Sequence, residues 1–155
     1  MIIAYSVKSL GKESIVHAYY DKARKELPSE MLERIEKVYA DAVKGMGDPE
    51  YAFVESKLTS KITALSRSKT PWEKELNADV MKLADLLQRA QEGKERVKLK
   101  VLNHIVAALF YFVNPYDVIS DYTPGTWLLD DAYVMGLCLA YFKQHSGEQY
   151  KKHFA

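Results

Sequence analysis

Four aspartates and no basic residue lie in the segment between Asn114 and Asp131. The segments on either side, residues 101–113 and 132–142, are the most apolar parts of the chain. Because a carboxylate is costly to bury without a partner, an acidic turn between two buried segments requires a structural or a chemical role. The four candidate residues are Asp117, Asp121, Asp130 and Asp131.

One interpretation of this cluster is a site for a hard divalent cation, since Mg²⁺, Mn²⁺ and Ca²⁺ prefer carboxylate oxygens. Asp117 and Asp121 share a side if the segment between them forms a helical turn. Asp130 and Asp131 are adjacent, so on a helix their side chains point about 100° apart and do not converge easily on one ion. All four aspartates are the metal ligands on this interpretation.

The other interpretation is that the aspartates stabilise the backbone. Asp117 can close an Asx-turn after Pro115. Asp130 or Asp131 can accept the free N–H groups at the start of the following helix, where the helix dipole favours negative charge. Aspartate at a helix start most often has this role, so we expect Asp117 and Asp130 to act chiefly by accepting backbone N–H bonds.

Two further residues could do chemistry. His104 lies in the apolar segment about three turns before Asp117, and a desolvated imidazole near a carboxylate is a common catalytic pair. A lone histidine on an apolar helix is more often a core residue with one satisfied hydrogen bond, which is the interpretation we favour. Cys138 has no histidine or basic residue within one turn on its own helix, which predicts an inert buried thiol.

Aromatic residues gather around the acidic turn. Tyr116, Tyr122 and Tyr133 flank it and would suit an interface with a protein or a ligand. The same tyrosines would also fit as core residues with their hydroxyls at the rim. The candidate binding residues are Asp117, Asp121, Asp130, Asp131, Tyr116, Tyr122 and Trp127.

Composition narrows the class of protein. The 155 residues, 48% apolar and 28% charged, are typical of one globular domain spanning residues 1–155. A net charge of +1 gives no general electrostatic attraction for nucleic acid. Cys138 is the only cysteine, which excludes an internal disulfide and fits a reducing compartment. The chain lacks Gly-x-Ser-x-Gly, His-Glu-x-x-His, Cys-x-x-Cys and a phosphate-binding glycine loop.

We expect no targeting signal in this sequence. The start of the chain has no basic lead and only a short apolar run, unlike a signal peptide. The longest uncharged run, Val101 to Tyr116, falls short of the roughly 20 apolar residues that a membrane-spanning helix needs. We therefore expect a soluble, cytoplasmic protein.

Hydrophobic periodicity, prolines and glycines predict an all-α fold of about six helices. The fifth and sixth are apolar nearly all round, which predicts a central hairpin joined by the acidic turn. Thr70 with Glu73 fits a capping box, Asp48 fits an N-cap, and Lys57 and Lys61 are placed on an outer helix face. Residues 1–10 are ambiguous, and the tail after Gly147 is expected to be polar. The predicted helices span residues 12–27, 29–44, 48–66, 71–92, 94–114 and 128–145.

The acidic turn also carries a family resemblance. Pro115-x-Asp117-Val118-Ile119-x-Asp121, then Pro124, then Asp130-Asp131 before an apolar helix, resembles the YkvA-like bacterial domain of unknown function (number 1232). The resemblance covers residues 103–139. It departs at Ser120, where the family usually has Pro, and at Trp127, where it usually has Gly. The resemblance implies a small helical domain and no established reaction.

Three functional hypotheses remain. The first is a non-enzymatic helical module that binds a protein partner, in a regulatory or toxin-neutralising role, with no cofactor. The second is a divalent-metal enzyme that uses the aspartate cluster with Mg²⁺, Mn²⁺ or Ca²⁺ and His104 as base. A third hypothesis is peripheral membrane association through the apolar hairpin. The sequence carries no sign of the oligomeric state.

Overall fold

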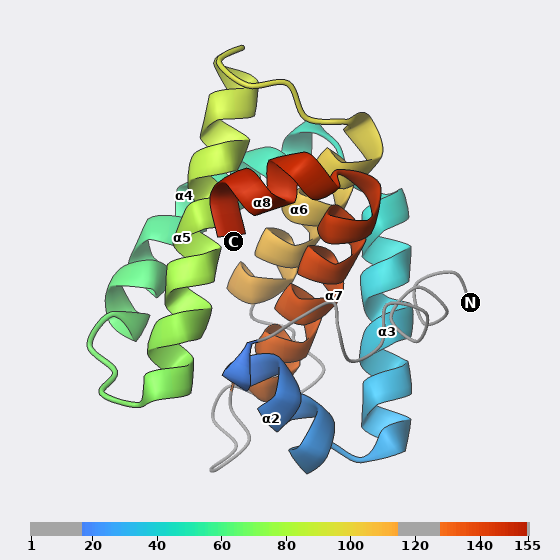
Figure 1. Ribbon diagram of the computed structural model, residues 1–155, viewed down its shortest axis with the longest axis vertical. Coiled ribbons are helices and arrows are strands. Elements are labelled where there is room, and N and C mark those ends of the chain that lie inside the picture. Colours follow the sequence, from blue (N-terminus) through green and yellow to red (C-terminus); the bar gives the residue numbers. More distant parts are fainter. Residues whose placement is uncertain (1–16, 115–127, 155) are drawn as a thin grey trace.

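The computed structural model describes residues 17–114 and 128–154. These residues form helices and the connections between them. Within these ranges the fold is all-α, and the prediction of this fold class is confirmed (Figure 1). The seven helices in these ranges are α2 (Ala18–Glu26), α3 (Ser29–Lys44), α4 (Asp48–Leu65), α5 (Pro71–Gln91), α6 (Leu99–Val113), α7 (Leu129–His145) and α8 (Gly147–Phe154).

Helices α6 and α7 form the centre of the fold. They pack against each other, α6 also contacts α3, α4 and α5, and α7 also contacts α2, α3, α5 and α8. Every residue of α7 from Leu129 to Ala140 is buried. This burial on all sides is what the apolar composition of both segments predicts.

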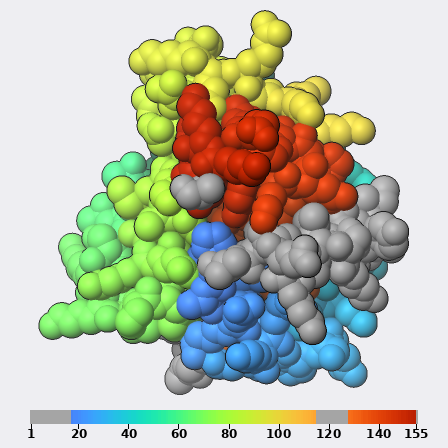
Figure 2. Space-filling view, in the orientation of Figure 1, coloured from blue at the N-terminus to red at the C-terminus, as the bar shows by residue number. Residues whose placement is uncertain are grey.

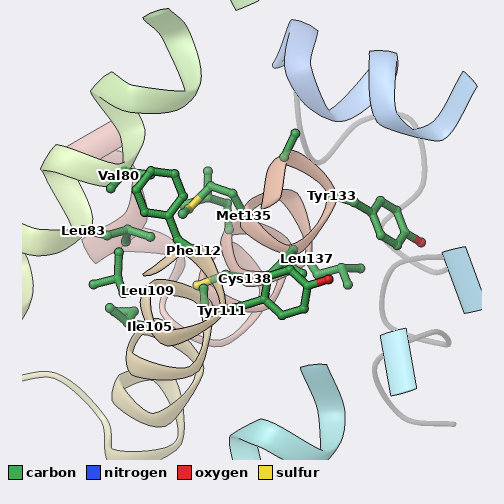
Figure 3. Close-up of a cluster of buried hydrophobic side chains, with 14 of the residues drawn as sticks. Val80, Leu83, Ile105, Leu109, Tyr111, Phe112, Tyr133, Met135, Leu137 and Cys138 are labelled. Carbon is green, nitrogen blue, oxygen red and sulfur yellow. The ribbon is translucent and has the colours of Figure 1, made fainter. Parts of the chain in front are cut away.

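All seven described helices contribute side chains to the core, and α6 and α7 contribute many of them. Ile105, Leu109 and Phe112 of α6 meet Met135 and Cys138 of α7 (Figure 3). Val80 and Leu83 approach the same cluster from α5 (Figure 3). Among the described residues, no helix is both long enough and apolar enough to cross a membrane.

Two helix boundaries differ from the prediction. Helix α6 begins at Leu99 instead of near Lys94, because Lys98 has a non-helical ψ of 139° and Gly93 adopts a φ of 74°. The predicted polar tail is instead α8, whose Tyr150 is buried and packs against Phe142 of α7. Eight residues give too short a periodic pattern to identify a helix. Residues 1–16, including the ambiguous start and the predicted first turns, lie outside the described residues.

Thr70 is the N-cap residue of α5, as predicted, but makes no side-chain capping bond, and the N-cap of α4 is Gly47 instead of Asp48. Asp48 is the first residue of α4 and makes no capping bond. The capping box of Thr70 with Glu73 is absent, because the hydroxyl of Ser68 takes its place. That hydroxyl donates to Oε1 of Glu73 at 2.7 Å and lies 3.1 Å from the backbone N of Thr70.

Candidate functional site

The first turn of α7 holds the two aspartates of the predicted cluster that fall within the described residues. Leu128 precedes it with a φ of 67°, a left-handed conformation that redirects the chain into the helix. Asp130 and Asp131 are both buried, with exposed fractions of 0% and 2%. Two buried carboxylates require partners, and the structure supplies them.

Asp130 is held by the hairpin itself. Its Oδ2 accepts a hydrogen bond from the Tyr111 hydroxyl of α6 at 3.0 Å. Its Oδ1 accepts the backbone N–H of Asp131 at 3.0 Å. The carboxylate therefore links the end of α6 to the start of α7. The expectation that Asp130 accepts a backbone N–H bond is confirmed.

Asp131 is paired with a residue that the periodicity assigned to an outer face. The Nζ atom of Lys61 on α4 lies 3.4 Å from Oδ2 of Asp131. Lys61 also donates to the backbone carbonyl of Phe112, and its ammonium lies 4.5 Å from the centre of the Phe112 ring. Its side chain is only 22% exposed, so the outward placement of Lys61 is wrong.

This position of Lys61 has an electrostatic reason. The C-terminal end of a helix carries partial negative charge, and α6 ends one residue after Phe112. The carboxylate of Asp131 adds a full negative charge beside it. One ammonium group therefore neutralises both, which fixes α4 to the closed end of the α6–α7 hairpin.

The remaining predicted site residues, Asp117, Asp121, Tyr116, Tyr122 and Trp127, lie in residues 115–127, outside the described residues. Within the described residues, no three His, Cys, Asp or Glu side chains are arranged to hold a metal ion. Of the predicted site residues, Asp130 and Asp131 are described, and their partners are Tyr111 and Lys61.

Tyr133 fits the core interpretation. Its side chain is buried, and its hydroxyl donates to Oε2 of Glu36 on α3 at 2.8 Å. Its ring stacks on that of Tyr20, with 5.6 Å between the ring centres. Burial and then the Glu36 carboxylate raise the pKa of Tyr133 well above its ordinary value.

His104 is a buried core histidine. The Tyr39 hydroxyl lies 3.0 Å from its Nδ1 atom, and its ring stacks on Tyr141 at 3.6 Å between centres. Burial, and then the nearby His145, lower the pKa of His104 to about 4, so the imidazole is neutral at pH 7. This arrangement agrees with the favoured interpretation of the sequence.

Cys138 lies fully buried in α7, one turn after Val134. Burial raises the pKa of its thiol to about 12, although a hydrogen bond with the Tyr39 hydroxyl opposes this shift. Because the thiolate is the reactive form, this thiol is inert at neutral pH, as the sequence predicts.

Sequence reasoning missed a charged cluster around Glu95, in the connection between α5 and α6. Its Oε2 lies 2.7 Å from Nε2 of His153 and 2.8 Å from Nε2 of Gln149, both on α8. Its Oε1 accepts from Arg89 at 3.2 Å. Burial raises the pKa of Glu95, but the bonds from His153, Gln149 and Arg89 outweigh it and lower the pKa to about 2.

Sequence reasoning also missed a groove of about 480 Å³ between α4 and α5, which we name the α4–α5 groove. Its floor is apolar and its exposed edge is polar and acidic, with Glu55 on one side and Glu92 on the other. No basic residue lines it. The lining residues are Tyr51, Val54, Glu55, Leu58, Thr59, Ile62, Ala84, Leu87, Gln88, Gln91 and Glu92.

The polar groups at this edge are held in place by short-range contacts. The Tyr51 hydroxyl donates to Glu55 at 3.3 Å, and Gln88 donates to Glu92 at 3.3 Å. Lys94 pairs with Glu92 at 3.1 Å and lowers the pKa of that carboxyl group. The only signal in the sequence was a set of acidic and amide side chains on the solvent sides of two helices, which is too common to single out a site.

Comparison with protein-family models gives a match in the central part of the chain. Residues 104–137 match the family model described as "Protein of unknown function (DUF1232)". No curated protein and no solved structure shows significant similarity to the chain. The match begins at His104 in α6, includes residues 115–127 and ends at Leu137 in α7. The central helical hairpin and the residues that connect its helices are thus similar to a DUF1232 domain, a domain of unknown function.

Proposed function

We propose that this protein is a non-catalytic helical module that binds a partner protein through the α4–α5 groove. The partner element is an amphipathic helix or turn with leucine-like side chains flanked by basic residues. The observation that carries the proposal is the combination of an apolar floor and an acidic edge without a basic residue.

The shape and chemistry of the groove support this class of partner. Val54, Leu58 and Leu87 form a floor that could accept apolar side chains in the helix-in-groove mode. Met81 lies three residues before Ala84 on the same stripe of α5 and is 52% exposed, so it adds apolar surface beside the groove. The carboxylates of the edge favour a basic partner through charge complementarity.

The state of the other candidate groups supports a non-catalytic role. Asp130 and Asp131 are engaged by Tyr111 and Lys61 inside the fold. His104 is buried and neutral, and Cys138 is buried with a raised pKa. The contacts of Asp130, Asp131 and His104 join α6 and α7 to each other and to α4 and α3.

A labelled synthetic helix tests the proposal. The probe carries leucines at positions i, i+4 and i+7 on one face and lysines on the other, and a control peptide has glutamates in place of the lysines. Fluorescence anisotropy should show binding of the basic probe and at least about tenfold weaker binding of the acidic one, because charge complementarity selects the partner.

Two protein variants sharpen this measurement. Glu55→Lys/Glu92→Lys reverses the charge of the edge and should weaken binding of the basic probe about tenfold or more. Glu30→Lys/Glu33→Lys makes the same charge change on exposed residues of α3 and should leave binding unchanged. Equal binding of both peptides, or equal loss in both variants, would disprove the proposal.

A further inference from the structure

An exposed leucine between two lysines stands at the start of α6. Leu99 is 71% exposed, the highest value among the exposed large apolar residues of the described chain. Lys98 and Lys100 flank it and are both exposed. We name these three residues the Leu99 knob. Figure 2 shows the yellow segment that contains it at one end of the molecule.

The knob has a firm base. The ammonium group of Lys98 donates to the backbone carbonyl of His145 at the end of α7, at 2.7 Å. Val101, two residues after Leu99, is buried in the core. Leu99 is therefore presented by a fixed helix end, although its own side chain remains in water.

The knob and the α4–α5 groove are complementary in type and charge. The knob offers one apolar side chain between two cations, and the groove offers an apolar floor beneath two carboxylates. Glu92 is partly neutralised by Lys94 of its own chain. Glu55, whose described partner is the neutral Tyr51 hydroxyl, therefore contributes more of the attraction.

We propose that the α4–α5 groove binds the Leu99 knob of a second copy of this chain. This inference rests on the proposed function and names its partner. Leu99 is exposed to water in the single chain, so the knob does not occupy its own groove. Because the two surfaces differ, each copy carries both halves of the contact, and association is either reciprocal about a two-fold axis or head-to-tail.

Sedimentation velocity across a concentration series tests this inference. The unmodified protein should associate beyond its monomer mass of 17.7 kDa as concentration rises. Added salt should weaken the association, since ions screen exposed charges. A protein that remains monomeric throughout the series would overturn the inference.

Two variants divide the contact into its halves. The knob variant is Leu99→Ser/Lys100→Glu, and the groove variant is Glu55→Lys/Glu92→Lys. Each alone should weaken association about tenfold or more, because charges across the contact become alike. An equimolar mixture should recover association, since the groove of the first and the knob of the second are both intact. Failure of the mixture to associate, or association of either variant like the unmodified protein, would overturn the inference.

Matched controls come from α3, which packs on α6 and α7. Val38→Ser removes an apolar side chain that is 40% exposed, and Glu30→Lys/Glu33→Lys repeats the charge change of the groove variant. Both controls should associate normally, and loss of association in them would overturn the inference by showing that general surface charge or hydrophobicity drives it.

The same samples separate the two proposals. If the protein stays monomeric but its groove binds the basic probe peptide in a manner lost in the groove variant, the self-association is wrong and the proposed function stands. If neither association nor peptide binding occurs, both are wrong. A peptide of residues 94–103 contains the Leu99 knob and tests its binding separately from the rest of the chain. This peptide should bind the unmodified protein and should not bind the groove variant.

Discussion

The ring of Tyr20 on α2 lies directly over the α-carbon of Gly136 on α7. A Cβ atom built at Gly136 would be 1.9 Å from Cδ1 of Tyr20, much closer than atoms can approach. The absence of a side chain at Gly136 is therefore what lets α2 pack against α7 at this point.

Gly136→Ala should destabilise the protein. Alanine favours the helix by about 1 kcal/mol, but overpacking against the Tyr20 ring costs about 1–3 kcal/mol or more. Urea unfolding measures the difference. Gly147→Ala is the control, because a Cβ there meets nothing within 4 Å. Tyr20→Ala should make the Gly136→Ala change less costly, and full additivity of the two changes would contradict this explanation.

Lys61→Met should lower the free energy of unfolding by about 3 kcal/mol, because it removes a cation that pairs with the buried carboxylate of Asp131. Methionine keeps the aliphatic length, so the change isolates the charge. Lys57→Met, on the exposed side of the same helix, serves as the control. Equal effects of the two substitutions in chemical unfolding would refute the role assigned to Lys61.

Asp130→Ala should lower stability by about 1–3 kcal/mol in the presence of EDTA, since it removes a buried carboxylate that accepts hydrogen bonds from the Tyr111 hydroxyl and from a backbone N–H. A metal site predicts the opposite sign, because removing a ligand relieves repulsion among anions in the apo protein. Thermal melts of the parent, Asp130→Ala and Asp117→Ala with EDTA or excess Mg²⁺, Mn²⁺ or Ca²⁺ distinguish these cases. A cation that raises the parent Tm by several degrees, but not that of either variant, would favour the metal site.

Glu95 should make stability depend on pH in the acid range. Its pKa is about 2 in the folded protein and about 4.3 in an unfolded chain. The stabilisation by Glu95 is therefore complete when the pH is above the unfolded pKa of about 4.3. It is lost as the pH falls through the folded pKa of about 2. Because water screens this cluster near the surface, we expect about 1–2 kcal/mol.

Urea unfolding from pH 7 to pH 2, for the parent and Glu95→Gln, measures this contribution. The variant should be less stable at pH 7 and should decline less between pH 4 and pH 2. Parallel curves for the two proteins would show that Glu95 does not contribute in this way.

His104 should remain neutral in the folded protein until the pH falls to about 4. An unfolded histidine binds its proton near pH 6.5, so stability falls as the pH drops from 6.5 and levels off below the folded pKa. An NMR titration of the His104 imidazole measures the folded value. A midpoint near 6.5 would mean that the ring is not desolvated by Tyr141 and its other neighbours.

Local sequence determined where most of the helices lie. Pro28, Gly45 and Pro71 mark helix limits because proline and glycine act on the backbone of their own turn. The apolar composition of residues 101–113 and 132–142 predicted the central hairpin, since a helix surrounded by others needs apolar residues on every side. Asp130 was identified as an acceptor of a backbone N–H bond for the same local reason.

Tertiary structure alone decided which polar groups meet. Lys61 reaches Asp131 across 70 positions of the chain, and Glu95 reaches His153 across 58. Helical spacing places Lys61 on the same side of α4 as the buried Leu58 and Leu65, but its partner Asp131 lies on another helix and cannot be identified from the spacing. The α4–α5 groove also depends on how helices pack, because its walls come from two different helices. Helical periodicity describes the faces of one helix and carries no information about its distance from another.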